Sequence, residues 1–93
     1  MHEAGIVDRI LDLAIDRARQ AGATRVRAVH LEAGELAGVS EEALRFHWEQ
    51  HAAGTPAEGA ALHLVLLDAP VELRLVAIDV EDADDSGGGA ATA

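Results

Sequence analysis

The hydrophobic pattern of the chain changes its spacing at Gly22, and this change constrains the fold more than any other feature of the sequence. From Glu3 to about Ala21, apolar residues recur at the spacing of one helical face, with charged residues around the rest of the cylinder. We therefore predict an amphipathic helix that ends at Gly22. Its predicted apolar face consists of Ile6, Ile10, Leu13, Ala14 and Ala18.

The next stretch is predicted to be a β-strand, because apolar and polar residues alternate from Thr24 onward. Val26 is out of phase with the rest of the strand, so we expect a β-bulge near Ala28. The other buried positions of this strand are predicted to be Val29, Leu31 and Ala33.

A second helix is predicted to begin at Ser40, because a serine hydroxyl accepts a hydrogen bond from a free N–H group of the first turn. Acidic residues follow in that turn, where the helix dipole favours them. The helix should end at Gly54-Thr55-Pro56. Its predicted apolar stripe is Leu44, Trp48 and Ala52, extended by Phe46.

Two further strands are predicted after this helix. The first, from Leu62 to Leu67, is apolar on both faces, which predicts that both faces are covered. Asp68-Ala69-Pro70 then forms a tight turn, and a third strand runs from Val71 to about Val80. A strand-helix-strand unit gives a parallel pair, and a short turn makes the last pair antiparallel. The sequence thus predicts an α+β fold in the order α-β-α-β-β, with two helices packed on a small mixed three-stranded sheet.

Residues 1–81 are predicted to form one domain, and residues 82–93 a disordered tail. A length of 93 residues suffices for one small core but not for two domains. The chain ends in a run of acidic residues followed by Ser, Gly, Ala and Thr, which cannot bury enough apolar surface to become ordered.

The composition excludes several classes of function. The net charge is −10 and all seven basic residues are scattered Arg, so binding to nucleic acid or to an anionic membrane is not expected. The chain has no Cys, which excludes a disulfide, a thiolate zinc site and a thiol nucleophile. It offers no nucleophile beside an oriented base, so we expect no enzyme activity. No signal peptide or membrane-spanning run is recognisable, and we expect a cytoplasmic protein.

The first three residues, Met1-His2-Glu3, bring together a free amine, a deprotonatable amide and an imidazole. The terminal amine and the His2 side chain can close fused chelate rings around the His2 backbone nitrogen. Such square-planar or tetragonal nitrogen sites suit Ni(II) or Cu(II). The N-terminus is therefore a candidate metal site, although three residues are a weak signal on their own; the alternative is a frayed terminus with an incidental histidine.

His47 and His51 are the second pair of candidate metal ligands. Residues four apart on a helix share one face, and two imidazoles there can chelate an ion. Two ligands make a weak site, and the alternative is a solvated helix face next to Trp48. The other two histidines, His30 and His63, lie on predicted strands, and we expect them at the surface.

Four short stretches of the sequence, in the same order, resemble the nickel-binding domain of the HypA/HybF hydrogenase and urease maturation proteins. They open the first helix, follow the first strand, lie in the second helix and precede the second strand. The resemblance covers about residues 1–81. The stretches are Met1-His2-Glu3, Gly34-Glu35-Leu36-Ala37-Gly38-Val39, Glu42-Ala43-Leu44-Arg45-Phe46 and Gly54-Thr55-Pro56-Ala57-Glu58-Gly59-Ala60.

The resemblance implies that the Met1 amine, the His2 side chain and the backbone nitrogens of His2 and Glu3 bind Ni(II). Glu3 then acts either as a favourable charge at the helix N-terminus or as a hydrogen-bonding partner of His2. The family also has a zinc domain, with two Cys-x-x-Cys pairs, between the second and third strands. Here Leu67-Asp68-Ala69-Pro70-Val71 joins these strands directly, so we expect no zinc site.

On this resemblance we expect a nickel metallochaperone that binds Ni(II) at its N-terminus and delivers it during hydrogenase or urease maturation. The implied partners are the nickel-insertion GTPase of the pathway and a hydrogenase or urease precursor. The alternative is a metal-free interaction module of the same family. Such a module would bind a maturation partner, or a second copy of itself in a homo-oligomer, through the sheet edge or the first helix.

Overall fold

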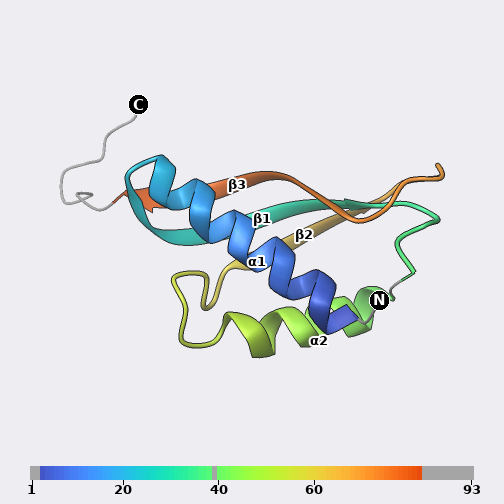
Figure 1. Cartoon of the computed structure of the whole chain (residues 1–93), viewed down its shortest axis with the longest axis horizontal. Coiled ribbons are helices and arrows are strands. Elements are labelled where there is room, and N and C mark those ends of the chain that lie inside the picture. The colour runs from blue at the N-terminus through green and yellow to red at the C-terminus, as the bar shows by residue number, and fades with distance from the viewer. Residues whose placement is uncertain (1–2, 39, 83–93) are drawn as a thin grey trace.

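The computed structural model describes residues 3–38 and 40–82, which form two helices and three strands (Figure 1). The predicted order α-β-α-β-β is confirmed. The elements are α1 (Glu3–Gln20), β1 (Ala23–Ala33), α2 (Glu41–Ala52), β2 (Ala61–Leu66) and β3 (Arg74–Asp82). Asp82, which the sequence assigned to the tail, is the last residue of β3; the rest of the predicted tail lies outside the described residues.

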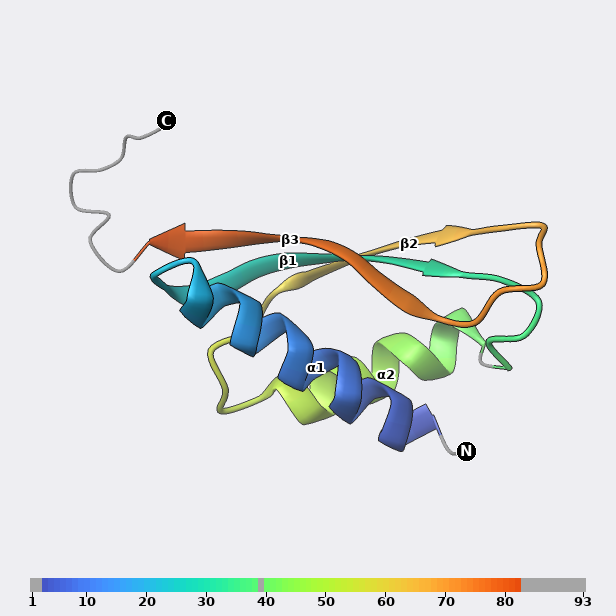
Figure 2. The same cartoon turned by 45° about the horizontal axis from the view of Figure 1, so that its top comes forward.

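The three strands form one mixed sheet in the order β2-β1-β3. β2 runs parallel to β1, and β3 runs antiparallel to it. Figure 2 shows α1 and α2 together on one side of this sheet. The predicted α+β architecture, with both helices packed on a small mixed sheet, is therefore confirmed, and the opposite face of the sheet carries no helix among the described elements.

The predicted antiparallel pairing of the last two strands is wrong, because β3 pairs with β1 and not with β2. The segment between β2 and β3, residues 67–73, crosses the end of β1 before the chain turns back, so β3 runs along the opposite edge of β1 from β2. There the Glu35 N–H donates to the Ala69 carbonyl at 2.9 Å, and the Leu36 N–H donates to the Val71 carbonyl at 3.1 Å. Ala69 and Val71 are therefore bonded to the loop after β1 and do not belong to a strand. β3 begins at Arg74, on the other edge of β1, and not at Val71.

The prediction that β2 is covered on both faces is also wrong. β2 lies at the edge of the sheet, and only Leu62 among its residues is buried. The side chains of Val65 and Leu66 are 54% and 69% exposed. The helices cover one face of the sheet, and no other described element covers β2 on the opposite face, so a strand that is apolar on both faces stays partly in solvent.

The predicted apolar face of α1 needs a correction at Leu13, which is 41% exposed. Successive helical residues are about 100° apart around the axis, so Leu13 lies well to one side of Ala14 and cannot share its buried direction. Val7 and Leu11, which the sequence did not assign to this face, are buried instead. The buried residues of α1 are Val7, Ile10, Leu11, Ala14 and Ala18.

The helix end and the strand bulge agree with the predictions. Gly22 has φ of +78°, the left-handed conformation that commonly terminates helices, and α1 ends at Gln20. The pairing of β1 with β3 shifts register between Val26 and Ala28, which confirms the bulge. Through this shift Val26 joins the buried side of β1.

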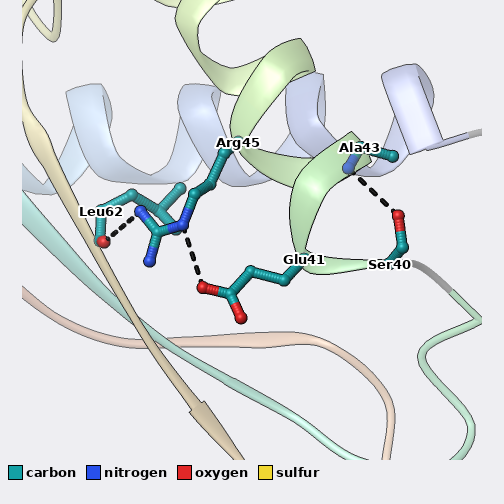
Figure 3. A network of polar contacts seen from close by, with 5 residues as sticks. All are labelled: Ser40, Glu41, Ala43, Arg45 and Leu62. Atoms are coloured by element: carbon teal, nitrogen blue, oxygen red, sulfur yellow. Dashed lines mark hydrogen bonds and ion pairs between the residues drawn. The ribbon is translucent and has the colours of Figure 1, made fainter.

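A network of polar contacts holds α2 against the edge strand (Figure 3). The Ser40 hydroxyl accepts from the Ala43 N–H at 3.1 Å, which confirms the predicted N-cap. The Arg45 guanidinium donates to Glu41 at 3.0 Å and to the carbonyl of Leu62 in β2 at 2.8 Å. Arg45 therefore connects the helix directly to β2. The predicted stripe of Leu44, Trp48 and Ala52 is buried, whereas Phe46 is 56% exposed.

Candidate metal centre

The predicted N-terminal site lies at the head of α1. Glu3 is the first residue of this helix, whereas Met1 and His2 lie outside the described residues, and only the backbone of Glu3 is described. The predicted ligand atoms belong to consecutive residues, so the chelate rings depend on local chain geometry and not on the tertiary fold. Binding of Ni(II) by Met1, His2 and Glu3 stays a prediction.

A pocket of about 420 Å³ lies beside the first turns of α1. Its charged side chains are Arg9 and Glu72, and no histidine among residues 3–38 and 40–82 lines it. Ala37 and Gly38, from the stretch after β1 that resembles the family, form part of its wall. The remaining lining residues are Ile6, Ile10, Leu36 and Leu73.

The second predicted pair of ligands, His47 and His51, lies on the half-buried flank of α2. Their ring centroids are 6.1 Å apart, and the ring planes are inclined by 72°. The fold adds a residue that the sequence did not indicate: Asp8 of α1, whose Oδ1 lies 2.5 Å from Nδ1 of His51. Asp8 is 43 residues away in sequence, and no local pattern connects the two.

The predicted surface histidines, His30 and His63, are brought together by the parallel pairing of β1 with β2, in which they are direct partners. Their rings stack with centroids 4.8 Å apart and planes inclined by only 14°. Nε2 of His30 also lies 3.1 Å from Oδ2 of Asp79 in β3. His63 is exposed and His30 is partly exposed, as expected.

Over residues 3–38 and 40–82, no three His, Asp or Glu side chains are grouped so as to hold a metal ion. The best donor set in this part of the chain is therefore a pair of imidazoles with one supporting carboxylate. Neither α1 nor α2 is long and apolar enough to span a membrane.

Comparison with known proteins adds a second line of observation to this geometry. Residues 1–74 match the family model described as hydrogenase/urease nickel incorporation, metallochaperone, hypA. The hydrogenase maturation factor HypA of Chloroflexus aurantiacus is 46% identical over 71 residues, which is 76% of this chain and 60% of that protein. The hydrogenase maturation factor HypA of Thermococcus kodakarensis is 42% identical over 74 residues, which is 80% of this chain and 53% of that protein.

A solved structure has the same fold. The solution structure of the Ni metallochaperone HypA from Helicobacter pylori superimposes with a TM-score of 0.79 and covers 88% of this chain and 99% of that one. Its sequence identity is 16%, so this likeness concerns the fold alone. The present chain spans 60% or less of the length of the two relatives described above.

Proposed function

The chain belongs to the HypA family of hydrogenase/urease nickel-incorporation metallochaperones, and from this membership we propose that it binds Ni(II) at its N-terminus and delivers the ion during hydrogenase or urease maturation. The proposed ligands are the amine of Met1, the imidazole of His2 and the backbone nitrogens of His2 and Glu3. Glu3 further supports the site, either by its charge or as a partner of His2.

The observation that carries this proposal is the extent of the family match. It begins at the first residue and includes Met1-His2-Glu3, so the predicted chelate lies within the matched part of the chain. A terminal amine, an amide and an imidazole form the kind of nitrogen site that Ni(II) prefers. A ligand set on three consecutive residues at a chain end is also open, which favours rapid transfer of the ion to another protein.

The proposed role is delivery without catalysis, in the cytoplasm. The chain would receive Ni(II) and pass it on by direct contact with the nickel-insertion GTPase of the pathway or with the enzyme precursor. Nickel is thus the cargo of this protein and not a resident cofactor. The net charge of −10 favours the approach of cations over the approach of nucleic acid or an anionic membrane.

We further propose that the domain needs no structural zinc. The sequence has no Cys, and a cluster of buried side chains from both helices and from β1 and β2 closes the core without an inserted metal module. A structural zinc ion contributes folding energy only to the module that it holds together. Zinc analysis of the purified protein measures this directly, and one equivalent of tightly held zinc would contradict it.

A second candidate function is an interaction module that no longer handles metal. The exposed side chains of Val65 and Leu66 on edge strand β2 favour this reading. In this case β2 would pair with a maturation partner or with a second copy of the chain, and His2 would have no role.

Complementation separates the two functions. In cells of the source organism that lack this gene, the parent gene should restore the activity of the nickel enzyme, and His2→Ala should not. Nickel added in excess to the medium should partly rescue His2→Ala, because the variant lacks a ligand and not a fold. The matched control is His63→Ala, an exposed histidine on β2, which should complement fully. Full complementation by His2→Ala would contradict nickel delivery and favour the metal-free module.

A further inference from the structure

We propose that His47 and His51 of α2, with Asp8 of α1 holding His51 in position, form a second Ni(II) site that is separate from the N-terminal one. Each of the three residues contributes a distinct part of the argument, and none of them belongs to the predicted N-terminal chelate.

Asp8 fixes the tautomer of His51. An ionised carboxylate only accepts hydrogen bonds, so Nδ1 of His51 carries the proton and donates it to Oδ1 of Asp8 at 2.5 Å. The lone pair of the neutral ring then lies on Nε2. Metal-binding histidines almost always donate their second nitrogen to a carboxylate, a carbonyl or water, which orients the ring and makes it a better ligand. His51 has this arrangement before any metal arrives.

His47 supplies the second nitrogen. It lies one helical turn before His51 on the same side of α2, and the two rings are inclined by 72°, so they are not stacked on each other. A ring nitrogen binds a zinc ion at about 2.0–2.1 Å, which places such an ion roughly 3 Å from the ring centroid. Two such bonds at a right or tetrahedral angle join rings with centroids about 4.5–5.3 Å apart. The observed separation is 6.1 Å, so the two side chains must turn toward each other by about 1 Å to share one ion.

The site is open to solvent, and its surroundings are negatively charged, which favours a cation. The side chains of His51 and Asp8 are 29% and 58% exposed, so an ion can enter and keep water on its remaining coordination positions. Imidazole ligands suit Ni(II), Cu(II) and Zn(II), and the carboxylate of Asp8 with the net charge of −10 attracts cations in general. Ni(II) is the ion that the family membership brings to this protein.

The other pair of histidines lacks this geometry and serves as an internal control. His30 and His63 stack almost in parallel, with 14° between their planes, so their lone pairs run side by side and do not converge. Nε2 of His30 contacts Asp79, as Nδ1 of His51 contacts Asp8, so the two pairs differ in ring orientation and not in carboxylate support. Residues 3–38 and 40–82 thus hold two histidine pairs, each with one aspartate, and the rings of one pair are stacked whereas those of the other are not.

The test uses the 93-residue protein in which the Met1 amine has been acetylated, so that the N-terminal site cannot bind Ni(II) tightly. The sequence has no Lys, so an amine-selective acetylating reagent modifies Met1 alone. Calorimetric titration with Ni(II) should show one site. Its affinity should fall at least about 10-fold in His47→Ala and in His51→Ala, and about 10-fold in Asp8→Ala, the low end of the usual loss for an outer-shell partner. His63→Ala should bind Ni(II) as the acetylated parent does.

Proton NMR of the acetylated parent gives a readout that needs no substitution and therefore does not depend on how a variant folds. Paramagnetic Ni(II) should broaden the ring signals of His47 and His51 first and leave those of His30 and His63 sharp. Broadening of the second pair first, or equal Ni(II) affinity in the His47→Ala/His51→Ala double variant, would overturn the proposal. The N-terminal site is blocked in this experiment and is measured separately in unblocked protein. The result can therefore contradict the proposal for one site and leave the proposal for the other site standing.

Discussion

Acetylation of the Met1 amine should abolish tight Ni(II) binding and leave the fold unchanged. The amine is a proposed ligand, and without it the chelate around the His2 backbone nitrogen loses one of its rings. Removal of an outer-shell partner typically lowers metal affinity about 10–100-fold. Loss of the amine, a direct ligand, should lower the affinity for Ni(II) by more than this. The buried residues described in α1 begin at Val7, so the described core does not include the Met1 amine. Calorimetric titration and circular dichroism of both forms measure the two expectations.

The matched control for this experiment is His63→Ala with a free amine, which should keep the affinity of the parent. A weak binding step that depends on His47 and His51 should remain in the acetylated protein. Acetylation is preferable to a one-residue extension, because an added residue would place the histidine at position 3 beside a new free amine and could create another chelate. Equal tight binding with and without the acetyl group would exclude the amine as a ligand.

Replacement of Gly34 by alanine should destabilise the domain strongly. A Cβ atom at this position would lie 2.4 Å from Cγ2 of Val71 and 2.6 Å from the carbonyl oxygens of Ala69 and Val71. The crossing segment would have to move, which would break its hydrogen bonds with the N–H groups of Glu35 and Leu36. Overpacking of this kind costs about 1–3 kcal/mol. Each kcal/mol lowers the melting temperature by about 4–8 °C in a domain of this size.

The control for Gly34→Ala is Glu35→Ala, the neighbouring exposed position. This variant keeps the N–H group that bonds to Ala69, so its free energy of unfolding should stay within about 0.5 kcal/mol of the parent. Thermal unfolding followed by circular dichroism measures both variants. If both have the melting temperature of the parent, close packing of the crossing segment on Gly34 does not determine stability.

Local sequence signals were enough to predict the elements of this fold. The Ser40 N-cap and the end of α1 before Gly22 each depend on residues within one turn, and both are present. Two non-local features were predicted wrongly. The pairing of β3 with β1 depends on hydrogen bonds between the crossing segment and the loop after β1, and the exposure of β2 depends on which face the helices cover. The alternation of apolar residues along a strand predicts neither the partner of β3 nor the exposure of β2.

The same distinction applies to the metal sites. The candidate chelate of Met1, His2 and Glu3 is contiguous, so the sequence alone was enough to suggest it. The spacing of His47 and His51 was also visible, because it is a helical repeat. Asp8 was not, since α1 and α2 must pack before its carboxylate meets His51. A single sequence holds no signal for such a contact between distant residues.

The most direct test of nickel binding at the N-terminus is Ni(II) titration of the parent and of His2→Ala at several pH values. An α-amine has an ordinary pKa of about 7.7–8.0 and an imidazole about 6.5, so protons compete with the metal for both ligands below about pH 8. The parent should bind Ni(II) tightly at pH 8 and lose on the order of 100-fold or more in affinity by pH 6. His2→Ala should lack this tight, strongly pH-dependent step. A His2→Ala protein that binds Ni(II) as tightly as the parent, with the same dependence on pH, would contradict the N-terminal nickel site.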